Sequence, residues 1–172
     1  YARTIMSSPV TRHDNWTAYY AIYLTRMTYV LPTCYLLEKQ LQKIEKRTIS
    51  ATLCKGGYVP TFPRRVVFGP HKFGGIAMRP LTIEQLIQQV QILLKHLRCP
   101  GECHALLRIM LTWAHLATGV GFSLLDSPAR VVPHLECQLT QSIRTGLASI
   151  GARIECEESF VALPRRISDG HI

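Results

Sequence analysis

The chain has 172 residues, of which 47% are apolar and 18% charged, and its formal net charge is +9 at pH 7. This length and composition predict one folded domain or slightly more and exclude a disordered tail. No stretch approaches 18 consecutive apolar residues, and the N-terminus lacks the apolar core of a secretory signal, which argues against a membrane span and against secretion. We therefore expect an intracellular protein, cytoplasmic or nuclear, without a membrane partner.

The positive charge is concentrated in the first half of the chain. Residues 1–79 contain twelve Lys or Arg against Asp14, Glu38 and Glu45, whereas residues 80–172 contain eight basic and eight acidic residues. Such an asymmetry is typical of a surface that meets a polyanion, most often nucleic acid. The alternative is a basic surface that serves only solubility.

Apolar periodicity in the first half predicts two helices. Asp14 is placed to cap the first, which ends near Leu31. The second is expected over 35–53, closed by the glycines at 56–57. A short extended or hairpin segment is expected near 62–79.

Three further helices are predicted in the second half. Thr82 and Gln85 have the spacing of a capping box, and the apolar stripe behind them spans 83–97. The next helix carries apolar residues at 106, 109, 110, 113 and 116 and ends at Gly119, and the last covers about 135–150. The tail, 152–172, offers at most a short strand. The fold class is therefore mainly α, with about five helices in a small bundle. We expect a basic segment with the connector (1–79) and a helical extension (80–172), which together form one cooperative unit.

The second predicted helix has one apolar and one basic face. At 100° per residue, Leu37, Leu41 and Ile44 share one side with Thr48. The opposite side carries four cations: Lys39, Lys43, Lys46 and Arg47. Their charges repel one another, and a phosphate backbone lying along this side would relieve the repulsion. The alternative is a solvated basic face without a ligand.

The connector "FPRRVVFGPHKFGGIAMRPL" (62–81) continues the basic character. Its apolar residues would hold it against the core, and its glycines at 69, 74 and 75 would let backbone N–H groups approach an anion. Such a segment suits positioning a nucleic-acid backbone and not reading bases. Its cations are Arg64, Arg65, Lys72 and Arg79.

These residues also form a recognisable pattern. The segment 27–81, "MTYVLPTCYLLEKQLQKIEKRTISATLCKGGYVPTFPRRVVFGPHKFGGIAMRPL", resembles the region just downstream of the polymerase core in reverse transcriptases of non-LTR-type retroelements. It contains a Tyr-x-Leu-Pro turn, a Lys/Ile-rich helix, a Lys-Gly-Gly break, the run Pro-Arg-x-Val-Val-Phe-Gly-Pro and two later glycines. The resemblance extends over about 16–154 and is strongest at 63–79.

The resemblance implies a thumb and its helical extension, which cradle the template–primer duplex. The partners would be duplex or RNA–DNA hybrid, held by its backbone, and the missing polymerase palm, where the family's catalytic aspartates lie. This chain has only Asp14, Asp126 and Asp169 and no Tyr-x-Asp-Asp, so we expect no polymerase activity from it alone, no catalytic residue and no cofactor. In the family the two glycines are followed by Leu-Gly, whereas Ile76-Ala77 follows here, a change that a decayed copy would carry.

Other residues invite weaker interpretations. Thiolates and imidazoles are the usual ligands of zinc, and the chain has both types close together at Cys99, Cys103, His104, His134 and Cys137. Their spacing is irregular, so we predict thiols without a metal. Tyr19, Tyr20 and Tyr23 have helical spacing and are expected in the core instead of stacking on bases.

The leading hypothesis is therefore a non-catalytic, nucleic-acid-holding segment of a retroelement reverse transcriptase, with the eight cations at 39, 43, 46, 47, 64, 65, 72 and 79 on phosphates. The alternative is a helical protein–protein interaction module whose basic surface is incidental and whose apolar faces at 83–97 and 106–117 dock a partner.

Overall fold

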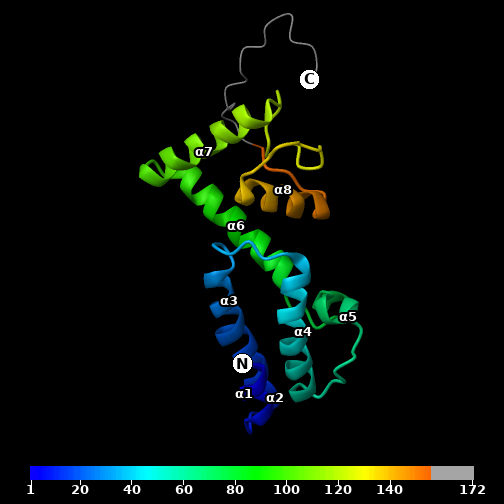
Figure 1. Cartoon of the computed structure of the whole chain (residues 1–172). Coiled ribbons are helices and arrows are strands. Elements are labelled where there is room, and N and C mark those ends of the chain that lie inside the picture. Colours follow the sequence, from blue (N-terminus) through cyan, green and yellow to red (C-terminus); the bar gives the residue numbers. More distant parts are fainter. Residues whose placement is uncertain (156–172) are drawn as a thin grey trace, which may run out of the picture. The chain divides into compact units, whose positions relative to one another are not determined.

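A computed structural model describes residues 1–155 (Figure 1). Within this range the chain is mainly helical and contains no β-strand, which confirms the predicted fold class. The chain forms two compact units, one of residues 1–88 and one from residue 89 onward. The division falls inside α6 (Leu81–Arg98), a few residues beyond the boundary that we predicted before this helix. No described helix is long and apolar enough to cross a membrane.

The first unit begins with α1 (Ala2–Ser7), followed by α2 (Arg12–Ala18), a π-helical segment (Tyr19–Leu24) and α3 (Thr25–Val30). The last three run on without interruption as one helix, as predicted. The helix begins earlier than predicted because Thr11, and not Asp14, is the N-cap. The Thr11 hydroxyl accepts from the Asp14 backbone N–H at 3.2 Å, so Asp14 instead closes the capping box from the third helical position.

The basic helix of the sequence is α4 (Glu38–Lys55), which lies beside the N-terminal helices (Figure 1). It begins three residues later than predicted, since Leu37 is extended and its N–H donates to the Gln40 side chain at 3.0 Å. It ends at Gly56 as predicted, and Gly57 has the left-handed φ of +83° that favours glycine. The core of this unit consists of Tyr19, Tyr23, Leu24, Leu31, Leu41, Ile49, Leu53, Val67, Met78 and Leu81.

The connector folds as a compact hook and not as a pair of strands. Pro63 precedes α5 (Arg64–Phe68), since a proline that lacks an N–H fits at a helix start. After a 3-10 turn (His71–Phe73), the chain returns along α5, where Ile76 and Met78 donate to the carbonyls of Val66 and Val67, each at 2.9 Å. The predicted extended piece is thus the return segment, and the other arm is helical.

The start of α6 is capped by a residue far away in the sequence. The Leu81 N–H donates to the Glu45 carboxylate of α4 at 2.9 Å, so the helix begins before the predicted capping box. The apolar stripe is mostly covered, but Ile87 is exposed and two glutamines, Gln85 and Gln89, are buried in its place.

The second unit contains the end of α6, α7 (Glu102–Thr118) and α8 (Gln138–Ile150). Helix α7 ends at Gly119 (φ +63°) as predicted. Helix α8 begins three residues later than predicted. The strand expected in the tail lies mostly outside the described residues, and 152–155 are irregular. The core of this unit consists of Leu93, Leu111, Ala114, Leu124, Leu125, Ile143, Leu147 and Ile154.

Candidate nucleic-acid interface

A basic groove lies between α1 and α4 in the first unit. Its volume is about 630 Å³, and three of the predicted phosphate contacts, Lys43, Lys46 and Arg47, line it. Arg3 of α1 adds a fourth cation, and no acidic residue is among the lining residues. The remainder of the lining is small or apolar: Ala2, Met6, Ser50, Ala51 and Cys54. We call this site the basic groove.

Helix α1 is held in place by contacts at both ends, which fixes Arg3 opposite the cations of α4. Tyr1 packs on Tyr23 with ring centroids 5.0 Å apart, and Ile5 is buried. At the other end, the Lys55 ammonium donates to the Ser8 carbonyl at 3.0 Å. Sequence analysis missed Arg3 because nothing in a six-residue helix indicates which element it packs against.

The orientation of α4 differs from the predicted one. Leu41 and Thr48 are buried as predicted, but Leu37 and Ile44 are exposed, while Glu45 is only 8% exposed. The buried face is thus rotated toward Glu45. The four cations remain on the exposed side, because residues two apart on a helix, such as Lys43 and Glu45, point about 200° apart.

Glu45 connects α4 to the connector on the side opposite the groove. Besides accepting from Leu81, it lies close enough to Arg64 for the guanidinium to affect its titration. Burial raises the pKa of the Glu45 carboxyl, and the hydrogen bond from Leu81 and the charge of Arg64 oppose that rise. The Arg64 Nη1 atom is buried without a hydrogen-bond partner, and Arg64 is not among the lining residues of the groove.

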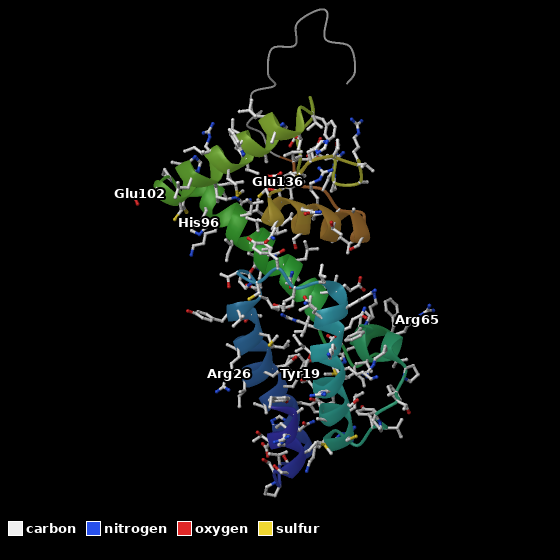
Figure 2. The ribbon with its side chains drawn as sticks, viewed as in Figure 1. Tyr19, Arg26, Arg65, His96, Glu102 and Glu136 are labelled. Atoms are coloured by element: carbon white, nitrogen blue, oxygen red, sulfur yellow. The ribbon has the colours of Figure 1, made fainter. Side chains whose placement is uncertain are left out.

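The other predicted contacts are scattered over the surface of the first unit. Lys39 is exposed on α4, and Lys72 lies over the Phe73 ring at 5.9 Å. Arg79 forms an ion pair with the buried Glu84 at 3.7 Å. Arg65 is exposed, and Figure 2 shows its side chain pointing away from the unit. The structure thus brings together three of the eight predicted contacts and separates the connector from them.

The connector glycines do not present N–H groups to an anion, contrary to our prediction. The N–H groups of Gly69, Gly74 and Gly75 donate to the carbonyls of Val66, His71 and Pro70, respectively. Gly69 and Gly75 are required instead by a close approach of the two arms of the hook, and Gly74 by its left-handed φ of +79°. A Cβ on Gly75 would lie 2.0 Å from the Gly69 carbonyl oxygen.

Ala77 has a backbone conformation that favours glycine. Its φ is +57°, in the left-handed region where a Cβ is crowded, and its N–H donates to the Gly69 carbonyl at 2.8 Å. Glycine, which the sequence pattern described above has at this position, would adopt this φ without strain.

The tyrosines are largely in the core, as predicted. Tyr19 and Tyr23 are buried, with stacked rings 5.6 Å apart, and Figure 2 shows Tyr19 between the N-terminal helix and α4. Burial is also the main reason why the pKa values of both phenols are raised. Tyr20 is 38% exposed, but its hydroxyl donates to the Ala77 carbonyl at 3.2 Å, so it supports the connector.

The residues considered for zinc are not assembled into a site in the described part of the chain. Cys99 and Cys103 are exposed, and the His104 ring contacts the His96 carbonyl through Nδ1 at 3.2 Å. Cys137 accepts from the Thr140 hydroxyl at 3.2 Å. No group of three or more His, Cys, Asp or Glu residues with the geometry of a metal site occurs within 1–155.

Comparisons with protein-family models, with curated proteins and with solved structures find no match to this chain.

Proposed function

We propose that the chain is a non-catalytic nucleic-acid-holding segment that binds a phosphate backbone in the basic groove. The observation that carries this proposal is the convergence of Arg3, Lys43, Lys46 and Arg47 on one recess without an acid among its lining residues. Cations held close together repel one another, and a polyanion removes this repulsion while releasing its own counterions. Binding of this kind is independent of sequence and depends steeply on salt.

The resemblance to the thumb of non-LTR retroelement reverse transcriptases gives the proposal its biological setting. It is supported by the Ala77 backbone, which has the left-handed φ that the glycine of the family pattern would adopt without strain. In this setting the ligand is an RNA–DNA hybrid or duplex, and the palm of a polymerase is the partner that supplies chemistry.

The test is fluorescence anisotropy of a labelled RNA–DNA hybrid titrated with the full chain over a salt series. The double variant Lys43→Glu/Arg47→Glu should weaken binding at low salt by about 100-fold and reduce the log–log salt slope by about two. Arg3→Ala should reduce the slope by about one. Binding that survives the double reversal unchanged would exclude the groove.

A matched control is the double variant Lys95→Glu/Arg98→Glu, which makes the same change in net charge on exposed residues of α6. If the control weakens binding as much as the groove variant, net charge alone is responsible and the groove has no special part. Circular dichroism of each variant establishes that the helices are intact.

A second candidate function, protein–protein interaction, is favoured by the exposed face of α7. Leu106, Ile109 and Trp113 are each at least 65% exposed, and Leu116 is 47% exposed, while the opposite face buries Leu111 and Ala114. Apolar stripes of this kind mark docking surfaces. Trp113→Ser/Leu106→Ser should abolish concentration-dependent association in sedimentation if this function is correct, and leave nucleic-acid binding unchanged.

A further inference from the structure

The second unit contains a pocket built around a buried arginine. Its volume is about 470 Å³, within the usual range for small-molecule sites, and it lies beside α8 and the loop that precedes it. Arg144 of α8 lines it and is only 5% exposed. None of the nucleic-acid contacts predicted from the sequence is among its lining residues.

Arg144 is a buried cation without a carboxylate partner in the described chain. Its Nη1 and Nη2 atoms donate to the carbonyls of Leu124 and Arg130. These bonds anchor the loop, but two neutral carbonyls do not neutralise a charge that burial has removed from water. Burial accordingly lowers the pKa of the guanidinium. Of its five N–H groups, these two bonds occupy only two.

The remaining lining includes charged, polar and apolar residues. Arg130 is fixed over the Phe122 ring at 4.9 Å, and His134 lies on the loop with a left-handed φ of +57°, which is uncommon for a non-glycine residue. Glu136, which Figure 2 shows near the start of α8, is the one acid among the lining residues. The apolar part consists of Pro128, Val132, Leu135 and Ala148.

We propose that this pocket binds a small organic anion, with a carboxylate or phosphate paired to Arg144 and an apolar body against the aliphatic wall. An arginine fork suits either head group, because both offer two oxygens to its parallel N–H donors. The site is independent of the basic groove, and its ligand is a small molecule and not a polymer.

The test titrates the full chain with phenyl phosphate, benzoate and phenol, which share one ring and differ in the head group, and follows backbone amide shifts by NMR. Phenyl phosphate, benzoate or both should shift amides within 128–148, and their relative affinities identify the preferred head group. Phenol at the same concentration should cause no comparable shift. Equal binding of phenol, no binding of either anion, or shifts confined to the amides around Arg3 and Lys43 would each overturn the proposal.

Two variants locate the site. Arg144→Lys removes the fork and should weaken anion binding by at least 10-fold, but it also removes the carbonyl bonds and could unfold the loop. Ala148→Trp leaves Arg144 in place and fills the pocket from an exposed helical position, so it should abolish binding without lowering the melting temperature. Unchanged anion binding to Ala148→Trp would show that the pocket is not the site.

Discussion

The basic groove and the connector contain the same kinds of side chain, yet the structure uses them in opposite ways. In the groove, Arg3, Lys43, Lys46 and Arg47 face one recess without a neighbouring acid among its lining residues. In the connector, Arg64 lies by Glu45, and Arg79 pairs with Glu84. The comparison teaches that a count of cations does not identify a binding surface, because buried acids can engage some of them. It also predicts that groove substitutions change binding, whereas connector substitutions change stability.

The largest expected effect on stability comes from Gly75→Ala. The added Cβ would overlap the Gly69 carbonyl, and since both atoms belong to backbone, the two arms of the hook must separate, at a cost of about 3 kcal/mol or more. Urea denaturation measures the loss. The control is Gly74→Ala, where φ is +79° but nothing lies within 4 Å, so only the backbone strain of about 1–2 kcal/mol applies. Equal losses would show that the hook is not closely packed.

Arginine-to-alanine substitutions in the connector and in the groove should separate stability from nucleic-acid binding. Arg64→Ala leaves the buried Glu45 without its nearby cation and should reduce the free energy of unfolding by about 1–2 kcal/mol, less than for a fully buried pair because Arg64 is half-exposed. Arg47→Ala should change it by less than about 0.5 kcal/mol, since Arg47 is exposed. Hybrid affinity should show the reverse order. A groove variant that unfolds the chain would contradict this division.

Glu45 should also give the connector a pH dependence that the groove lacks. Because its folded pKa is raised above the ordinary value, its stabilising contribution is present below about pH 4.5 and is lost as the pH rises through the folded pKa. Glu45→Gln keeps an acceptor for Leu81 and does not titrate. Relative to this variant, the natural chain should therefore lose stability as the pH rises above about 4.5 and through the raised folded pKa. A constant difference in unfolding free energy over this range would mean that Glu45 titrates normally.

The smallest expected effect is a gain. Ala77→Gly relieves a left-handed φ at the end of the hook and should stabilise the chain by about 1 kcal/mol, the strain removed minus the added flexibility of the unfolded glycine. Thermal unfolding measures it, with no change in hybrid affinity expected. A loss of stability would indicate that the alanine methyl makes a favourable contact that outweighs the strain.

Much of the helical architecture could be predicted from local signals. The glycines at 56 and 119 end their helices as expected, because a glycine at the C-terminal end of a helix stops it through its own backbone conformation. The rotation of α4 could not be predicted, since burying Glu45 depends on Leu81 and Arg64, which are remote in the sequence. For the same reason the groove was only partly predicted: its three α4 cations follow from periodicity, but Arg3 depends on how α1 packs.

On α7, periodicity identified an apolar stripe but not which way it faces. Trp113 and Ile109 are exposed, while the smaller Ala114 is buried. An amphipathic pattern indicates that a helix has an apolar face, not whether that face is buried, and here no described residue of the unit covers it.

The π-helical segment Tyr19–Leu24 has a consequence for how this sequence can change over generations. A π-helix holds about one residue more per turn than an α-helix, so this segment has the form of a one-residue insertion that the N-terminal helix absorbed without breaking. Because the π-turn takes up the extra residue locally, deleting the exposed Ala21 should restore regular α-helical winding while the helix on either side keeps its orientation. The N-terminal helix can therefore lose one residue at this segment without turning α1, and Arg3 with it, away from the groove.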